Sequence, residues 1–90
     1  MKFFPSSQHA IAATVLDILA GVLIVDVTRM WPDDRLIADL GMGQVDGLDV
    51  YHLDGEVRTR FGISVLDVFK TKDPSVREVI EYIWQRVSPN

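Results

Sequence analysis

Three stretches of apolar residues, each repeating at intervals of three or four, constrain this chain of 90 residues. Residues at those intervals fall on one side of an α-helix, so each stretch predicts a helix with one buried face. The first stretch comprises Ile11, Val15, Ile18, Leu19, Val22 and Leu23. The second comprises Val50, Leu53, Val57 and Phe61. The third comprises Val76, Val79, Ile80, Ile83 and Val87. The sequence therefore predicts a small all-α domain.

The first helix is expected to begin after Pro5, where Ser6 or Ser7 can accept hydrogen bonds from free N–H groups, and to run to about Val25. The run 22–27, which is rich in β-branched residues, is not assigned to a strand, because no partner strand or hairpin signal lies nearby. Trp31 precedes a proline, a position that disfavours helical geometry, so helical structure should end there.

A long loop is expected to extend to Val45, with its apolar residues around Leu36, Ile37 and Leu40 holding it to the core. The second helix should then start at Asp46. Its capping positions would be filled by Asp46 and Asp49, whose carboxylates favour the positive end of a helix dipole.

Turn and capping residues mark the remaining elements. Gly62 is suited to stop the second helix, and a short third element is expected around Leu66–Phe69. Before the last apolar stretch, Ser75 and Glu78 have the spacing of a capping box, which predicts where the last helix begins.

The composition indicates one soluble folded domain, with 48% hydrophobic and 24% charged residues. Without cysteine the chain has no disulfides and no thiolate nucleophile, which is compatible with the cytoplasm, the location expected here. The apolar run from Ala10 to Val25 contains Asp17 and is shorter than a bilayer span of about 20 residues, so a buried helix is expected rather than a membrane span.

Charge is unevenly distributed. Residues 33–56 contain seven acidic residues and one basic residue, Arg35. A surface that binds nucleic acid needs clustered Lys and Arg, so this acidic middle argues against such a partner. It favours a protein partner with a basic surface, although a solvated acidic face without a partner is the commoner explanation.

The central motifs are Asp39-Leu40-Gly41, Asp46-Gly47-Leu48-Asp49 and Phe61-Gly62-Ile63, with Phe61 fourteen residues after Gly47. This arrangement resembles the acyl carrier proteins, in which the pattern D-L-G-x-D-S-L-D is followed, fourteen residues after the serine, by a phenylalanine. Later segments also match: Val65-Leu66-Asp67, Pro74-Ser75-Val76 and Ile80-Glu81-Tyr82-Ile83 stand in the places of I-P-D, T-T-V and hydrophobic-x-Tyr-Ile.

The resemblance covers about residues 11–87 and implies an acyl-carrier-like four-helix bundle with a short third helix, forming one domain over residues 1–90. In that family the serine carries a 4′-phosphopantetheine cofactor. Here Gly47 takes its place and has no hydroxyl to attack coenzyme A, and no serine or threonine lies between Arg29 and Arg58. No cofactor is therefore expected at Gly47. The link Met42-Gly43-Gln44-Val45 is also longer than usual for the family.

The resemblance further implies a protein-binding surface on the second helix, whose acidic face is recognised by basic patches of enzymes. Asp46, Asp49 and Glu56 are the candidate contact charges, and Asp54 would belong to the same face. His52, Arg58 and Arg60 add positive charge to it, which implies partners other than those of fatty-acid synthesis.

Among the aromatic residues, Trp84 is the candidate for a partner-facing side chain, because it cannot share a helical face with Tyr82. Trp31 and Tyr82 are expected in the core.

The favoured function is a non-catalytic, regulatory protein-interaction module. Two alternatives stay open: a helical bundle that binds a lipid or another small ligand, and an active carrier modified at another residue. No enzyme is expected, because the chain has no nucleophile elbow or other catalytic motif. No metal site is expected either, since His52 with Asp49 and Glu56 is more typical of a charge-paired helix surface.

Overall fold

The computed structural model describes residues 4–42, 48–70 and 72–87. Three α-helices carry the fold: α1 (His9–Leu23), α2 (Leu48–Phe61) and α3 (Val76–Val87). Three 3₁₀ turns accompany them: η1 (Ser6–Gln8), η2 (Val27–Arg29) and η3 (Leu66–Phe69). The described residues form no strand, and only an isolated bridge joins Arg35 to Ser75. The all-α prediction is confirmed, whereas the expected short third helix is a single 3₁₀ turn.

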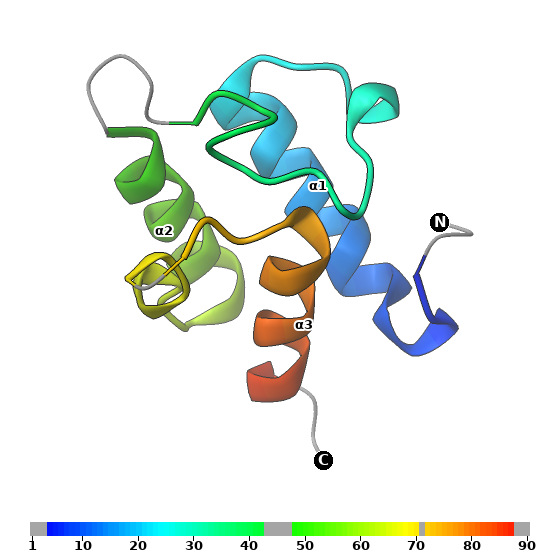
Figure 1. The fold of residues 1–90 in the computed structure, drawn as a ribbon. Helices are drawn as coiled ribbons and strands as arrows, with labels where there is room; N and C mark the ends of the chain where they lie inside the picture. Colours follow the sequence, from blue (N-terminus) through cyan, green and yellow to red (C-terminus); the bar gives the residue numbers. More distant parts are fainter. Residues whose placement is uncertain (1–3, 43–47, 71, 88–90) are drawn as a thin grey trace.

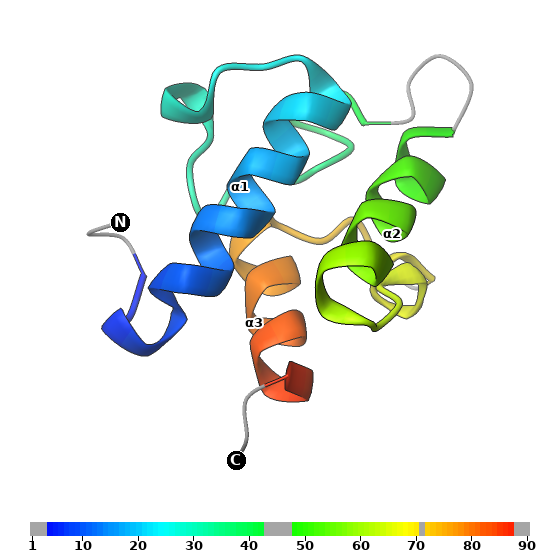
Figure 2. The same cartoon turned by 180° about the vertical axis from the view of Figure 1, so that it is seen from behind.

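The three α-helices enclose one core (Figure 1). α1 contacts both α2 and α3, and the end of α1 lies at the same end of the molecule as the start of α2 in both views (Figures 1 and 2). The predicted stripes supply nine of the 17 buried hydrophobic residues in the described part of the chain. The fully buried ones include Val15, Leu19, Leu53, Val57, Val76, Val79, Ile80 and Ile83.

The start of α1 differs from its prediction. Neither Ser6 nor Ser7 caps the helix; they form η1, and the Ser6 carbonyl accepts a hydrogen bond from the His9 N–H. Backbone carbonyls of a tight turn thus satisfy donors that a serine hydroxyl was expected to satisfy. With η1, α1 forms an 18-residue helical stretch, Ser6–Leu23, whose mean hydropathy of 1.3 and length would suffice to cross a membrane, a test that buried core helices also pass.

α1 ends two residues earlier than predicted, at Leu23. Ile24 adopts the left-handed conformation, with φ 55°, and its side chain is 90% exposed. The N–H groups of Ile24 and Val25 both donate to the Ala20 carbonyl, which closes the last turn. A β-branched residue is rarely found with positive φ, so this helix end is strained.

The long loop is held to the start of α3. The Asp34 and Pro32 carbonyls accept hydrogen bonds from the N–H groups of Val76 and Arg77 at 2.9 and 2.8 Å. In return, the Asp73 carboxylate accepts from the N–H groups of Ile37 and Ala38, each at 2.9 Å. Leu36 is fully buried, as predicted, and Ile37 and Leu40 pack against the core.

The predicted helix signals near α2 and α3 are confirmed. Gly62 has φ 73° and its N–H donates to the Arg58 carbonyl, so it ends α2. In the capping box, the Ser75 N–H donates to Glu78 Oε1 at 2.9 Å and the Glu78 N–H donates to Ser75 Oγ at 3.1 Å.

Candidate functional site

Two predicted positions lie outside the described residues. They are Gly47, which takes the place of the family's serine, and Asp46, which was predicted both as a contact charge and as the first residue of the second helix. The structure describes α2 from Leu48, with Asp49 in its first turn. The described part of the candidate site therefore consists of α2 from Leu48 onward and of the elements that lie beside α2.

The start of α2 exposes large apolar side chains. Leu48 and Tyr51 are 62% and 65% exposed, although apolar groups of this size gain free energy when they leave water. His52 is exposed, whereas Asp49 and Glu56 are half-buried. The surface of α2 that combines these five residues, called here the α2 surface, presents apolar area next to two carboxylates.

Asp54 does not belong to the α2 surface, contrary to the prediction. It is only 5% exposed and its carboxylate is turned toward the chain that follows α2. Its Oδ1 accepts hydrogen bonds from Ser64 Oγ at 2.7 Å and from the Val65 N–H at 2.8 Å, and Oδ2 pairs with Arg58 Nε at 2.9 Å. A buried carboxylate needs such donors, so Asp54 is fully engaged within the fold. Arg58 pairs with it from the surface, where its side chain is 60% exposed.

An apolar hollow lies between α2 and η3. Val50 and Tyr51 line it from α2, Leu66 and Phe69 line it from η3, and Lys70 stands beside them. Its volume is about 370 Å³. We call it the α2–η3 hollow.

The charges near this hollow are paired. The Lys70 ammonium lies 2.8 Å from the Asp67 carboxylate, and both side chains are largely exposed. Hydrogen bonding to Asp67 raises the pKa of Lys70, and the same bond lowers the pKa of Asp67. Both groups therefore stay charged throughout the neutral range.

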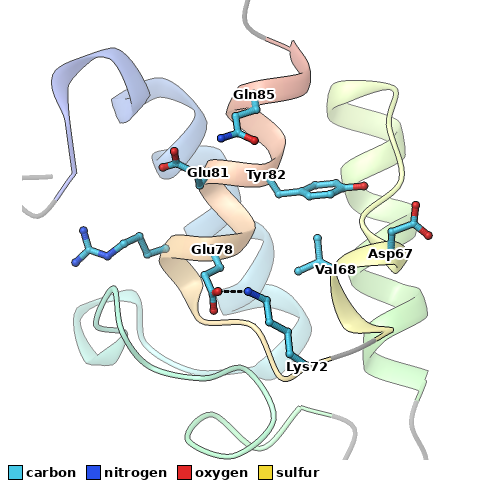
Figure 3. A pocket seen from close by; sticks show the side chains of 8 residues that line it. Asp67, Val68, Lys72, Glu78, Glu81, Tyr82 and Gln85 are labelled. Atoms are coloured by element: carbon cyan, nitrogen blue, oxygen red, sulfur yellow. Dashed lines mark hydrogen bonds and ion pairs between the residues drawn. The ribbon is translucent and has the colours of Figure 1, made fainter.

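A second hollow, of about 410 Å³, separates η3 from the outer side of α3. The Tyr82 ring extends from α3 toward Val68, and the Lys72 ammonium forms an ion pair with Glu78 (Figure 3). Arg86 stacks over the Tyr82 ring, 3.5 Å from its centre. The residues that line the hollow carry both signs of charge, and Lys72 and Glu78 pair with each other. The lining therefore favours no particular ligand.

The remaining aromatic predictions have mixed outcomes. Tyr82 is half-buried and packs against the core, as expected. Trp31 is 56% exposed, so the prediction of a core residue is wrong. Its neighbours Met30 and Pro32 are buried instead, and Trp31 flanks a small apolar depression that they line together. Trp84 is half-buried, which leaves its suggested contact role a prediction.

Among the described residues, no group of three or more His, Cys, Asp or Glu side chains is arranged to hold a metal ion. Sequence reasoning missed the buried role of Asp54 and the exposure of Leu48 and Tyr51. The only available signal for Asp54 was its position next to Leu53 and three residues before Val57, which places it at the edge of the buried stripe.

Known proteins with similar sequences give a consistent result over nearly the whole chain. The acyl carrier proteins of Rickettsia canadensis (strain McKiel) and Rickettsia rickettsii (strain Iowa) are each 32% identical to it over 83 residues. The acyl carrier protein of Rickettsia prowazekii (strain Madrid E) has the same identity over the same length. In each case the match covers 92% of this chain and 93% of the relative. No family model matches the chain. These similarities, together with the all-helical fold, show that the chain belongs to the acyl carrier protein family.

Proposed function

We propose that this chain is an acyl-carrier-like protein that binds a protein partner through the α2 surface and carries no phosphopantetheine arm. It would act as a regulator or scaffold in the cytoplasm, without catalysing a reaction. The observation that carries the proposal is the pair of exposed apolar side chains, Leu48 and Tyr51, beside the carboxylates of α2.

The chemistry of the partner follows from that surface. A few well-packed residues near the centre of an interface, often Tyr, provide most of the binding free energy, and surrounding charges select the partner and its orientation. A partner surface with an apolar patch bordered by Lys or Arg would complement Leu48 and Tyr51 together with Asp46, Asp49 and Glu56.

The absence of the arm is inferred from the sequence. Phosphopantetheinylation requires an aliphatic hydroxyl at the attachment position, and the chain from Met30 to Val57 contains neither serine nor threonine. Gly47, which takes the serine's place in the family pattern, has no side-chain oxygen. The proposal therefore expects the protein purified from its native host to have the mass of the bare chain.

The partner can be tested by affinity capture from native-host lysate with the wild-type protein, Asp49→Arg and Tyr51→Ser as baits. Asp33→Arg is the matched control, because Asp33 lies on the loop, is 88% exposed and undergoes the same change of charge. We expect a basic protein that the wild type and Asp33→Arg capture and both α2 variants lose. Equal capture by all four baits would show that the α2 surface is not the binding site.

The arm can be tested by intact mass spectrometry. Gly47→Ser, incubated with coenzyme A and a phosphopantetheinyl transferase, should gain one phosphopantetheine, whereas the wild type should gain none. A wild-type protein that acquires the arm at another residue would refute the proposal and support an active carrier with a non-standard site.

The α2–η3 hollow favours a second candidate function, the binding of a lipid. Its volume of about 370 Å³ lies within the range of about 300–1,000 Å³ typical of ligand pockets, and its walls are mostly apolar. Native mass spectrometry of the protein from its host should then show a bound fatty acid. Phe69→Asp, which places a charge in the wall, should abolish that adduct, while Asp33→Arg should keep it.

A further inference from the structure

Asp54 is a charged residue with a buried position and three partners, and none of these partners lies on the α2 surface. Its Oδ1 accepts two hydrogen bonds, from the Ser64 hydroxyl at 2.7 Å and the Val65 N–H at 2.8 Å. These two donors are consecutive residues that directly precede η3. One carboxylate oxygen therefore ties the chain entering η3 to the middle of α2.

The turn that follows has little stability of its own. η3 comprises four residues, and one isolated helical turn is unfavourable because nucleation fixes several dihedral angles for one hydrogen bond. Two apolar residues anchor it, Val65 at 0% and Val68 at 8% exposure. The Asp54 hydrogen bonds connect this region to α2 through polar groups, and the Val65 N–H would be buried without an acceptor if they were lost.

The position of η3 also determines the shape of the α2–η3 hollow. Leu66 and Phe69 form its η3 wall, and Val50 and Tyr51 form its α2 wall. Figures 1 and 2 show η3 beside α2 in both views. Because Asp54 lies on α2 and bonds the residues next to Leu66, it fixes the separation of the two walls.

We propose that the Asp54 carboxylate is a latch that holds η3 against α2 and thereby sets the opening of the α2–η3 hollow. When its bonds to Ser64 and Val65 break, η3 separates from α2 as a local opening and exposes Leu66 and Phe69. The α1 and α3 helices keep their packing. This property is independent of whether the protein binds a protein partner or a lipid.

Arg58 makes a smaller contribution. It pairs with the other carboxylate oxygen, Oδ2, and its side chain is 60% exposed. The Asp54 side chain is only 7% exposed, but water reaches the Arg58 guanidinium and screens part of the pair. Replacing Arg58 therefore removes the ion pair but keeps the two hydrogen bonds that define the latch, so the two contributions can be measured separately.

The test is amide hydrogen exchange followed residue by residue by NMR in the full chain. In Asp54→Ala we expect the exchange rates of the Val65, Val68 and Lys70 amides to rise by about tenfold or more, since each lost bond involved a charged acceptor. The Ile80 and Ile83 amides of α3 should exchange at their wild-type rates. In Arg58→Gln the rates for the η3 region should rise less than about threefold.

Asp73→Ala is the matched control, because Asp73 also accepts two hydrogen bonds, from the N–H groups of Ile37 and Ala38. It should accelerate exchange at Ile37 and Ala38 and leave η3 protected. A hydrophobic dye such as anilinonaphthalene sulfonate should fluoresce more strongly with Asp54→Ala than with Asp73→Ala.

Two results would overturn the proposal. If Asp54→Ala accelerates exchange evenly over all helices, Asp54 is an ordinary core residue rather than a latch. If η3 exchange stays unchanged, its apolar anchors alone hold it. Should Asp54→Ala fail to fold, Asp54→Asn is measured against the same criteria, with about a threefold increase at Val65 as the smallest supporting result.

Discussion

Replacing Ile24 with glycine should stabilise the protein, although it removes an apolar side chain. Ile24 ends α1 in the left-handed conformation with φ 55°, where its Cβ crowds the following carbonyl oxygen. Its side chain is 90% exposed, so almost no buried apolar area is lost on truncation. The backbone hydrogen bond from residue 24 to the Ala20 carbonyl remains available to glycine.

The size of the effect follows from two opposing terms. The left-handed conformation costs an L-residue roughly 1–2 kcal/mol, and glycine does not bear this cost. Glycine loses more backbone entropy on folding, which opposes the gain by about 0.5–1 kcal/mol. The difference between these ranges is centred on about 0.75 kcal/mol and extends from about 0 to about 1.5 kcal/mol. The central value should raise Tm by about 3–6 °C for a domain of this size.

Thermal and urea denaturation followed by circular dichroism measure both quantities. Gly62→Ala is the reciprocal control, because Gly62 has φ 73° and no atom lies within 4 Å of an added Cβ, so conformational strain alone should destabilise that variant. A lower Tm for Ile24→Gly would refute this prediction, because it would mean that the exposed isoleucine stabilises the fold by a contact.

Three further predictions concern the helices. Gly55→Ala should raise the free energy of unfolding by about 1 kcal/mol in urea titrations, because Gly55 lies inside α2 and no atom lies within 4 Å of an added Cβ. A lower free energy of unfolding would mean that α2 needs a flexible position there. Ser75→Ala should lower the free energy of unfolding by about 1 kcal/mol, because it removes the hydroxyl that accepts a hydrogen bond from the Glu78 N–H. An unchanged free energy of unfolding in the same titration would show that this cap contributes nothing. The pKa of Glu78 in the folded protein is lowered from 4.5, mainly by the hydrogen bond from Lys72 and next by the one from the Ser75 N–H. The ionised Glu78 therefore stabilises the fold fully above pH 4.5, and this stabilisation is lost as the pH falls through the folded-state pKa. Glu78→Gln should consequently lower Tm at pH 7 but converge with the wild type in acid, and a constant difference across the pH range would contradict this linkage.

The periodicity of the apolar residues predicted the three helices, because a helix that buries one face needs apolar residues at intervals of three or four. The end of α2 and the start of α3 were located closely, since Gly62 and the Ser75–Glu78 capping box mark these two positions by local chemistry. The end of α1 was less accurate. Ile24 favours neither a helix end nor a positive φ, so no local rule signals that the helix stops at Leu23.

The candidate site was harder to predict because it depends on contacts between distant residues. The place of Asp54 at the edge of the apolar stripe indicates that it lies close to the core, but not which groups it would meet there. Its donors come from Ser64 and Val65, ten and eleven residues further along the chain. Trp31 was expected in the core as the default for an aromatic residue, but its neighbours Met30 and Pro32 are buried instead. Such outcomes depend on how segments pack, and the one-dimensional pattern does not contain that information.

The mutual bonding of the loop and α3 has a consequence for the order of folding. Two of the first N–H groups of α3 are capped by carbonyls from residues more than forty positions earlier, and Asp73 caps the loop in return. Neither the loop nor the start of α3 can complete its hydrogen bonds until the two segments are in contact. Bringing together residues more than forty positions apart carries an entropic cost. A peptide comprising residues 73–87 alone should therefore be much less helical than α3 is in the protein, despite its capping box. The contacts between loop and α3 should form late, after α1 and α2 have brought the two segments together.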